Sequence, residues 1–505
     1  MTTRSNQYFK SVANQWDSLR SGYFQESVRE IAIQKAYLRP EMSVADIGAG
    51  TGFLSTALAP LVQQVHAVDA SPEMLAVARN NLAGFSNIHY HEAEGQAIPL
   101  PSASMDAVFA NMYLHHTPDP LAAIREMVRL LKPGGRLIIT DLDTHTHTWM
   151  REEMADTWLG FERDQMRQWY RQAGLVNVFV ECTDQSCCSS SETQPDAEKA
   201  EISVFAAVGT SRIERRKAVQ QSYSLIAESG GGCGCDSRSS AISGQSNTSS
   251  GCCSGAGSLA PGETLSHPIS LGYDTSELKV IPSEAGELSL GCGNPFAMAS
   301  LKSGETVLDI GSGAGMDAFL AANKVGASGK VIGVDMTPAM LERARQSAQR
   351  NGYTQVEFRE GQADQLPAED ASVDVVISNC VINLTEDKSA VFAEAFRVLK
   401  PGGRLEISDT VSAAGMPEDL RSSTAEWAAC VSGSLPEAEY LDLIRAAGFS
   451  NLRTQSSAGY TMGDYAQVHS LVVSAVKPDA DSALPTSGCC GGVSTAGKTG
   501  IALGV

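Results

Sequence analysis

Cysteine is the residue type in this chain with the widest range of possible chemistry. The sequence has 12 cysteines, and thiolate sulfur is a soft ligand that selects soft metals and metalloids. Six of them form adjacent pairs in Gly/Ser-rich stretches that also contain Cys233 and Cys235; the pairs are Cys187-Cys188, Cys252-Cys253 and Cys489-Cys490. This placement predicts mobile thiol groups rather than core residues.

Three further cysteines, Cys292, Cys380 and Cys430, lie apart from one another in the second half. Taken singly, each is typical of a small buried hydrophobic residue. A structural zinc site is a second alternative, although the chain has no Cys-x-x-Cys spacing with a matching second pair. A disulfide framework is disfavoured, because the chain is acidic and shows no apolar leader segment.

The charge of the chain narrows the class of partner. The formal net charge is -20 at pH 7, whereas binding to nucleic acid or to an anionic membrane depends on basic surface. Met1–Lys10 is polar, and no stretch approaches the roughly 18 apolar residues of a membrane span. We therefore expect a cytoplasmic protein that acts on a small substrate, with no nucleic-acid or membrane partner.

The two halves of the chain carry the same motifs in the same order. Val44–Gly52 reads VADIGAGTG, and Val307–Gly315 reads VLDIGSGAG. The run Lys-Pro-Gly-Gly-Arg-Leu begins at Lys132 and again at Lys400. So many ordered matches indicate that one fold has been duplicated.

Each half alternates short β-branched runs with helical patterns. In the first half the order is VHAVD, MLAVARNNL, AVFAN, IREMVRLL and RLIITD. This order predicts parallel strands joined by crossover helices. We expect an α/β protein with two tandem Rossmann-like domains, each built on a mostly parallel doubly wound sheet.

Composition predicts the domain boundaries. We expect a first domain at 1–210, a charged connector that begins the second domain at 211–228, a flexible Gly/Ser/Cys-rich segment at 229–262, a second domain at 263–478 and a flexible Cys-containing tail at 479–505. The two flexible segments have too little apolar surface to offset the entropy of the chain.

A glycine-spaced turn follows the first strand of each half. In the second half the turn reads Asp309-Ile-Gly311-Ser-Gly313-Ala-Gly315, and the next strand ends at Asp335. Such a turn directs backbone N–H groups toward a ligand, and an acid at the end of the second strand can accept hydrogen bonds from ribose hydroxyls. Because Phe53 and Met316 occupy the third-glycine position of Gly-x-Gly-x-x-Gly, a nicotinamide cofactor is disfavoured.

With these motifs, both halves resemble class I S-adenosylmethionine-dependent methyltransferases. The resemblance implies S-adenosylmethionine as the cofactor, and it implies which residues hold the methionine part, the ribose and the adenine. In the second half these are Asp309, Gly311, Gly313, Gly315, Asp335, Met336, Gln362, Ala363 and Asn379. In the first half they are Asp46, Gly48, Gly50, Gly52, Asp69, Ala70, Glu94 and Gly95. Gln362 departs from the acid that is common at its position.

Three segments of the second half carry cysteines that ordinary small-molecule methyltransferases lack. Cys380 follows the fourth strand in Ser378-Asn379-Cys380, where substrate meets the methyl donor. Cys292 lies in LSLGCGNP, and Cys430 follows Trp427 in WAACVSG. Together with LGYDTSEL and the Cys-rich stretch before it, these segments resemble arsenite methyltransferases over about 217–478.

This resemblance implies that Cys292, Cys380 and Cys430 hold arsenic as the substrate and are catalytic. Delivery of arsenite or relay of electrons is open to three sets of thiols, which are Cys252-Cys253, Cys489-Cys490, and Cys233 with Cys235. Three thiolates suit trivalent arsenic, which is soft and keeps a lone pair to attack the methyl group. The resemblance also implies arsenite or thiol-bound arsenite as the acceptor, thioredoxin or glutathione as the reductant, and arsenic detoxification as the role.

The first half differs at the acceptor positions. Met112 stands where the second half has Cys380, and the following Tyr-Leu-His115-His116 resembles quinone and other small-molecule methyltransferases. The two histidines are either a base or packing residues beside the cofactor. His145 and His147 either bind a metal or lie in a solvated loop. Two other functions stay open for the chain: methyl transfer to quinone-like or other carbon or oxygen acceptors, and metalloid binding by a thiol-rich protein without turnover.

Overall fold

A computed structural model describes residues 3–191, 193, 199–229, 268–269, 271–287, 291–298, 300–417, 420, 427, 431–456, 460–462 and 466–479. Cys252, Cys253 and Cys430 lie outside these residues, as do 230–262 and 480–505 of the two segments expected to be flexible. None of the helices in the described ranges is long and apolar enough to cross a membrane.

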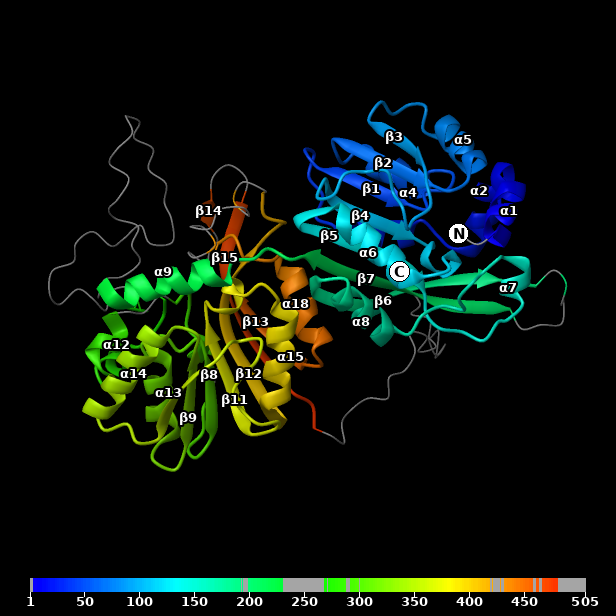
Figure 1. The fold of residues 1–505 in the computed structure, drawn as a ribbon. Helices are drawn as coiled ribbons and strands as arrows, with labels where there is room; N and C mark the ends of the chain where they lie inside the picture. The colour runs from blue at the N-terminus through cyan, green and yellow to red at the C-terminus, as the bar shows by residue number, and fades with distance from the viewer. Residues whose placement is uncertain are drawn as a thin grey trace, which may run out of the picture.

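The first half contains α-helices (α), 3-10 helices (η) and strands (β) in alternation (Figure 1). They are α1 (Thr3–Val12), η1 (Ala13–Gln15), α2 (Trp16–Tyr23), α3 (Ser27–Gln34), β1 (Ser43–Ile47), α4 (Phe53–Leu58), β2 (Gln64–Asp69), α5 (Pro72–Asn81), β3 (Ile88–Glu92), β4 (Met105–Asn111), η2 (Leu114–His116), α6 (Pro120–Leu130), β5 (Leu131–Leu142), α7 (Met150–Glu153), α8 (Arg163–Gln172), β6 (Leu175–Ser189) and β7 (Ala200–Ser211).

The second half repeats this succession after a long helix. Its elements are α9 (Arg216–Ser229), α11 (Thr275–Leu278), α12 (Ser283–Glu287), η3 (Pro295–Ala297), β8 (Thr306–Ile310), α13 (Met316–Val325), β9 (Lys330–Asp335), α14 (Pro338–Arg350), β10 (Val356–Glu360), β11 (Val373–Asn379), η4 (Ile382–Leu384), α15 (Lys388–Val398), β12 (Leu399–Ser412), α18 (Glu437–Ala446), β13 (Ser450–Ser456), β14 (Tyr460–Met462) and β15 (Ala466–Val476).

The strands form two sheets with the same topology. The first has the order β3-β2-β1-β4-β5-β7-β6, and the second has the order β10-β9-β8-β11-β12-β15-β13, with β14 paired to β15. The first five strands of each order are parallel, whereas β7 and β15 run antiparallel to both of their neighbours. The expected fold of two mostly parallel doubly wound sheets is therefore confirmed.

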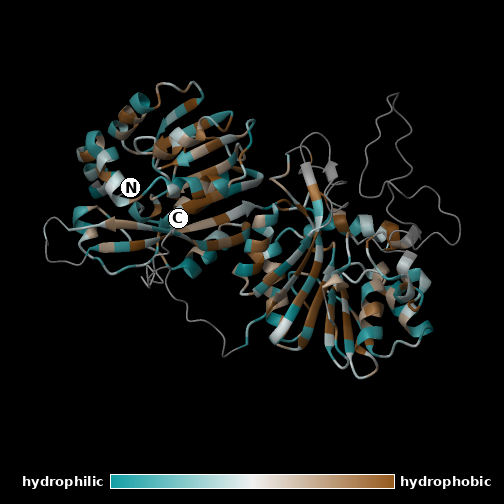
Figure 2. Cartoon of the chain, turned by 180° about the vertical axis from the view of Figure 1, so that it is seen from behind, coloured by the Kyte–Doolittle hydropathy of each residue, from teal (hydrophilic) through white to brown (hydrophobic). Residues whose placement is uncertain are grey.

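Alternate side chains of a strand point to opposite faces of the sheet, and helices cover both faces. In β8, Val307 packs in a cluster with α13 and α14, whereas Leu308 packs in the cluster that contains α15 and α18. In Figure 2 the strands in the middle of each domain are coloured mainly as hydrophobic, whereas the helices around them include many hydrophilic residues.

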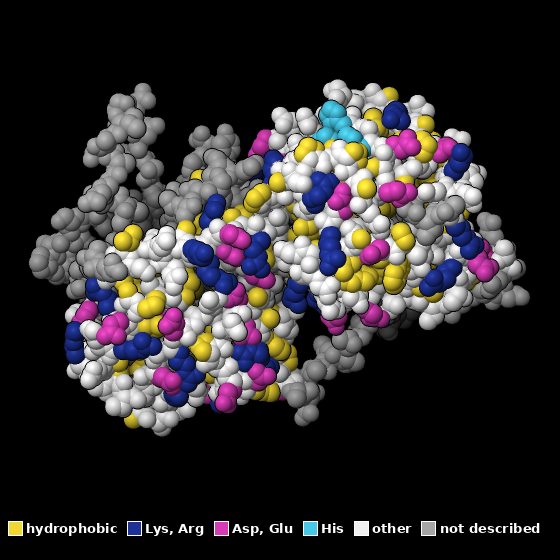
Figure 3. Space-filling view, viewed as in Figure 1, with side chains coloured by type: hydrophobic (Ala, Val, Ile, Leu, Met, Phe, Trp, Pro, Cys, Tyr) yellow, Lys and Arg dark blue, Asp and Glu magenta, His cyan; other side chains and the backbone are white. Residues whose placement is uncertain are grey.

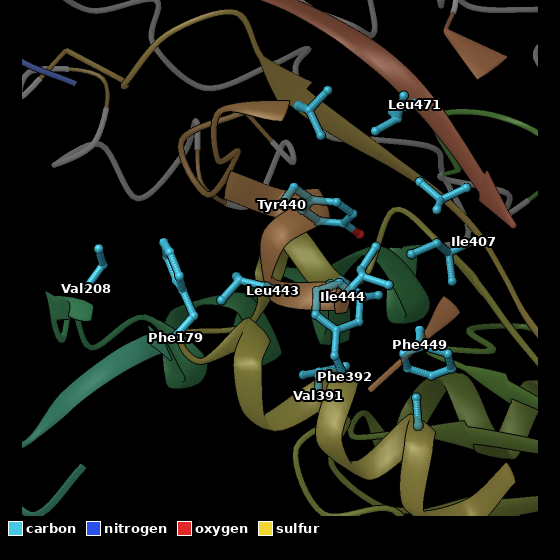
Figure 4. Packing of buried hydrophobic residues seen from close by; sticks show 14 of the residues in the cluster. Phe179, Val208, Val391, Phe392, Ile407, Tyr440, Leu443, Ile444, Phe449 and Leu471 are labelled. Carbon is cyan, nitrogen blue, oxygen red and sulfur yellow. The ribbon is translucent and has the colours of Figure 1, made fainter. Parts of the chain in front are cut away.

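The two domains pack against each other. Phe179 and Val208 of the first domain belong to one buried cluster with Phe392 and Leu443 of the second (Figure 4). Lys35 Nζ lies 2.9 Å from Asp442 Oδ2, and Arg136 forms an ion pair with the buried Glu439. The apolar contact joins β6 and β7 of the first domain to α15 and α18 of the second, and the ion pairs join Lys35 and Arg136 to α18.

One expectation about the thiol pairs is wrong. Cys187-Cys188 lies in strand β6 rather than in a mobile stretch, and Cys187 is buried in a cluster with Phe24 and Trp149. The strand forms because Cys187 and Cys188 pair in register with Ile202 and Glu201 of β7. Alternation along the strand then places Cys187 in the core and leaves Cys188 partly exposed.

Candidate active site

A cavity of about 140 Å³ lies at the carboxyl ends of β8, β9 and β11. The predicted cofactor residues that line it are Asp309, Gly311, Gly313, Asp335, Met336, Gln362, Ala363 and Asn379. Gly311 has φ 74°, and a Cβ there would meet Val381 at 2.2 Å. The turn therefore requires glycine, which brings the backbone to the edge of the cavity.

Gly315 has a structural role in the same turn. It is the N-cap of α13 with φ 98°, and a Cβ would lie 2.8 Å from Phe319 and 2.9 Å from Phe358. It allows the helix to start close under the sheet, and it is absent from the described residues that line the cavity.

Asp335 is held by two backbone donors at the end of β9. Its Oδ2 accepts the N–H of Gly313 at 3.0 Å, and its Oδ1 accepts the N–H of Thr337 at 2.8 Å. Burial raises the pKa of this carboxyl, although the two N–H groups act in the opposite direction. The side chain is thus fixed in place at the wall where a ribose would bind.

Asp309 brings an unmatched negative group into the cavity. It is 2% exposed, and among the described residues its Oδ2 has no hydrogen-bond partner. Burial, with Asp317 and Asp335 nearby, raises its pKa well above the ordinary value. A positively charged ligand group would relieve this arrangement, and the ammonium and sulfonium of S-adenosylmethionine are such groups. The cavity therefore fits the cofactor implied by the sequence.

Helix α9 supplies a wall that the sequence reasoning missed. Arg216, Val219 and Tyr223 line the cavity, and Gln220 Nε2 donates to the carbonyl of Met336 at 2.9 Å. Arg216 also binds the side chains of Gln362 and Asp364. The sequence had indicated only a charged connector at 211–228, because the spacing of the residues in this segment does not point to a ligand.

Two of the three predicted arsenic ligands meet beside this cavity. The sulfur atoms of Cys292 and Cys380 and a carboxylate oxygen of Asp409 lie within 4.8 Å of one another. Cys380 lines the cofactor cavity, and so does Gly291, the residue that precedes Cys292 in the sequence. Cys292 Sγ lies 3.9 Å from the carbonyl of Ser408, and Cys380 Sγ lies 3.8 Å from Thr410 Oγ1. One thiol therefore lines the cavity, and the second lies within 4.8 Å of it.

Asn379 fixes the loop that carries Cys292. Its Oδ1 accepts the Cys292 N–H at 3.1 Å, and its Nδ2 donates to the carbonyl of Gly293 at 3.0 Å. The same Nδ2 lies 2.8 Å from the hydroxyl of Tyr273, which donates to Asp317 at 2.6 Å. Tyr273 and Asp317 were not predicted as site residues, since only the fold brings them to Asn379.

Asp409, which was not predicted as a site residue, lies beside the two thiols. Its Oδ2 accepts the N–H of Asn383 and the hydroxyl of Tyr440, both at 3.0 Å. Burial raises its pKa to about 7, against the opposite effect of nearby Lys388. The first half has an aspartate, Asp141, at the corresponding position, although the residues that follow differ between the two halves. This repetition could have suggested a site role for Asp409.

The third predicted ligand, Cys430, lies outside the described residues. Trp427, which belongs to the same sequence motif, is buried and packs in a cluster with Val219, Cys380 and Leu384. Its Nε1 donates to the carbonyl of Leu384 at 3.2 Å. The described part of the motif therefore contacts the segment that follows Cys380.

The first domain has the same frame with a smaller cavity of about 50 Å³, which is lined by Asp46, Gly48, Gly50 and Asp69 among others. Asp69 accepts the N–H groups of Gly50 and Ser71, each at 2.8 Å, just as Asp335 does in its own domain. Gly52, Ala70, Glu94 and Gly95 are not among the described residues that line it.

Tyr113 explains the smaller volume. A Cβ on Gly48 would lie 2.3 Å from its ring, and one on Gly95 would lie 2.0 Å from its hydroxyl oxygen. The side chain thus reaches from the glycine turn to Gly95, a path that the shorter Val381 leaves open in the second domain. Met112, with φ 51°, has the backbone conformation of Cys380, with φ 59°, so the two positions correspond.

The histidines of the first domain separate into two places. His115 and His116 are both 5% exposed, and they lie in a cluster with Asp156. The rings of His145 and His147 are 5.7 Å apart, and within the described ranges no third side chain joins that pair to form a metal-binding group.

Comparison with known proteins identifies the domain type. Residues 45–139 and 301–456 each match a family model of a methyltransferase domain. The arsenite methyltransferase of Halobacterium salinarum is 44% identical over 236 residues, which are 47% of this chain and 57% of that protein. That of Aquipseudomonas alcaligenes is 37% identical over 201 residues, 38% of this chain and 58% of that protein. The chain thus matches a little over half the length of these relatives.

A solved structure, an arsenic(III) S-adenosylmethionine methyltransferase from Chlamydomonas reinhardtii, is 36% identical; the match covers 40% of this chain and 73% of that one, with a TM-score of 0.38. One family match falls in each of the two sheets, and methyltransferase domains imply S-adenosylmethionine as the cofactor. The chain therefore contains two class I methyltransferase domains in tandem, and part of it is homologous to arsenite methyltransferases.

Proposed function

We propose that this protein transfers methyl groups from S-adenosylmethionine to trivalent arsenic at Cys292 and Cys380, as a step of arsenic detoxification in the cytoplasm. The observation that carries the proposal is the meeting of these two sulfur atoms within 4.8 Å at the wall of the cofactor cavity. The similarity of part of the chain to arsenite methyltransferases supports the choice of acceptor.

Arsenite binding requires thiols that can replace its hydroxides. Each thiol forms a sulfur–arsenic bond, and its proton leaves with the displaced hydroxide as water. Cys292 and Cys380 supply two such bonds, and we assign the third to Cys430, whose neighbour Trp427 packs near Cys380. Soft sulfur ligands select arsenic over hard cations, which prefer oxygen.

The methyl transfer needs alignment more than acid or base catalysis. S-adenosylmethionine supplies a methyl group on a positively charged sulfur. Asp309 and Asp335, which line the cavity, hold the donor, and Cys380, which lines the same cavity, directs the arsenic lone pair toward the methyl carbon. Holding nucleophile and carbon within about 3–3.5 Å provides most of the acceleration in such a step.

Arsenic leaves this step formally pentavalent, and the next methylation needs two electrons to restore the trivalent state. Two thiols supply them by forming one disulfide. We assign this relay or the delivery of arsenite to Cys252 and Cys253, with thioredoxin or glutathione as the final reductant. The protein should bind no nucleic acid, and Figure 3 shows acidic and basic side chains interspersed over one face without a continuous basic area.

The test is an assay of the full chain with arsenite, a thiol reductant and labelled S-adenosylmethionine. We expect methylated arsenicals from the unaltered protein, a loss of at least 100-fold in Cys380→Ser, and full activity in Cys188→Ser, which changes a thiol of the first domain. Arsenite binding without any product would favour metalloid sequestration. Methyl transfer to a hydroquinone but not to arsenite would favour the small-molecule alternative.

A further inference from the structure

A second group of ligating side chains lies in the first domain, next to Asp141, the residue that corresponds to Asp409 of the thiol site. One ligand atom from each of His115, His116 and Asp156 lies within 4.8 Å of the others, and all three residues are buried. Asp156 Oδ1 is 3.9 Å from His115 Nε2 and 3.8 Å from His116 Nδ1. These gaps are too long for hydrogen bonds.

Asp156 lacks the partners that a buried carboxylate needs. Among the described residues its Oδ2 is buried and makes no hydrogen bond. A carboxylate in such surroundings is costly unless it is paired or coordinates a metal. Two imidazoles lie beside it, and a metal ion bound to their ring nitrogens would supply the counter-charge. His116 Nδ1 also lies 3.4 Å from the carbonyl of Ala155, a contact that an ion bound at this nitrogen would replace.

Asp141 prepares His115 for this role from the other side. Its Oδ1 lies 2.6 Å from His115 Nδ1, and its Oδ2 accepts the N–H of Leu114 at 2.8 Å. A carboxylate that accepts the Nδ1–H leaves the lone pair on Nε2, the nitrogen that faces Asp156. Metal-bound histidines commonly have this arrangement, in which an outer carboxylate fixes the tautomer and the orientation of the ring.

The group lies beside the donor cavity of the first domain. His115, His116 and Asp156 line a small cavity of about 30 Å³. His116 and Met112 line this cavity as well as the donor cavity, so the two are adjacent. An ion here would therefore lie close to the donor cavity.

The duplicated domains support the assignment. Asn383 and Leu384 occupy the second-domain 3-10 helix where the first domain has His115 and His116, while Asp409 corresponds to Asp141. The second domain groups Asp409 with two thiols, whereas the first groups two imidazoles with Asp156, and Asp141, the counterpart of Asp409, contacts His115 from the other side. Each domain thus has ligand atoms beside its donor cavity, but of different softness.

We propose that His115, His116 and Asp156 bind one divalent transition-metal ion of the zinc class, with Asp141 as the residue that orients His115. In tetrahedral coordination, ligand atoms about 2.1 Å from zinc lie roughly 3.4 Å apart. The two distances from Asp156 to the imidazoles, 3.9 and 3.8 Å, exceed this by about half an ångström, and all three ligand atoms lie within 4.8 Å of one another. The ion gives the first domain an acceptor site for a ligand with a hydroxyl or a thiol, independent of the arsenic site.

The test uses the full chain with the background Cys380→Ser, so that the thiol site does not contribute. Zinc content and zinc affinity are measured by mass spectrometry and by competition with a chromophoric chelator. We expect one equivalent of zinc, a loss of at least 100-fold in affinity for Asp156→Asn and His116→Ala, and a loss of about 10- to 100-fold for Asp141→Asn. His147→Ala is the matched control and should retain the ion.

Cobalt provides a second readout that does not depend on activity or on full folding of one variant. Cobalt bound to imidazole and carboxylate should give visible bands without the near-ultraviolet sulfur-to-cobalt band of a thiolate site. Absence of stoichiometric zinc in the background protein, unchanged affinity in both Asp156→Asn and His116→Ala, or a cobalt spectrum of thiolate ligation would each overturn the proposal.

Discussion

The Asn379 side chain ties Cys292 to the end of strand β11, because its Oδ1 accepts the backbone N–H of Cys292 at 3.1 Å. The same amide contacts the hydroxyl of Tyr273 at 2.8 Å. The position of one thiol therefore depends on a hydrogen-bond network that contains no sulfur.

Tyr273→Phe should weaken arsenite binding about fivefold, since one buried hydrogen bond contributes about 1 kcal/mol. Affinity for S-adenosylmethionine should change less. Calorimetric titrations of arsenite and of the methyl donor compare the two effects. Tyr353→Phe is the control, because its hydroxyl donates to the carbonyl of Val280 at 3.2 Å on the surface. Equal arsenite affinity in both variants would contradict the positioning role.

Asp335→Asn should weaken binding of S-adenosylmethionine in the second domain by at least tenfold, because charge-assisted hydrogen bonds contribute roughly 1.5–3 kcal/mol. The amide retains one acceptor for the backbone N–H groups, so the turn itself should persist. Calorimetry on the full chain should show that one binding event weakens, whereas Asp69→Asn affects the other. A titration of Asp335→Asn that matches the unaltered protein would reject the ribose assignment.

Glu406 predicts a pH dependence of stability. Burial raises the pKa of this carboxyl from 4.5 to about 7, so the folded protein binds its proton more tightly than the unfolded chain. Its contribution to stability is fully present below about pH 4.5 and is lost as the pH rises through 7. Glu406→Gln should therefore increase the free energy of unfolding at pH 8 by roughly 1–3 kcal/mol and raise the melting temperature there. At pH 4.5 the substitution should have little effect.

Glu305→Gln is the control for this measurement. Burial raises the pKa of Glu305, but the pair with Arg404 outweighs it and the net shift is downward. Its replacement should therefore lower the melting temperature at pH 8. If Glu406→Gln and Glu305→Gln changed the melting temperature at pH 8 in the same direction, the account of Glu406 would be refuted.

Arg136→Ala should destabilise the contact between the domains. Glu439 is 1% exposed and loses its cation, and breaking a buried pair by removing one partner costs about 3–5 kcal/mol. Scanning calorimetry should show a lower melting temperature or a separation into two transitions. Lys10→Ala, which removes an exposed partner of Glu73, should leave the profile unchanged. A single unshifted transition in Arg136→Ala would mean that this pair does not join the domains.

The sequence predicts the glycine turns and the ribose-position acid of the site better than the residues that pack around them. The glycine turns and Asp335 were readable because a strand, a turn and a helix start fix them locally, within a few residues of one another. Tyr273, Asp317 and helix α9 were not readable, since their contacts with Asn379 and Met336 come from tertiary packing. The thiols Cys252, Cys253 and Cys430 lie outside the described residues, so their assigned roles stay predictions.

The buried Cys187 shows the limit of composition as a guide. Its Ser- and Cys-rich surroundings indicated a mobile stretch, but pairing of β6 with β7 decides the structure there. Serine and cysteine are compatible with a strand when a partner strand satisfies their backbone groups. Such long-range pairing is not visible in the local sequence.

X-ray absorption at the arsenic edge of the arsenite-bound full chain tests the central claim most directly. The account predicts a first shell of three sulfur atoms and no oxygen in the unaltered protein, with at least one sulfur lost in Cys380→Ser and none lost in Cys188→Ser. A first shell of oxygen atoms, or a three-sulfur shell that is unchanged in Cys380→Ser, would contradict the assignment of arsenic to this site.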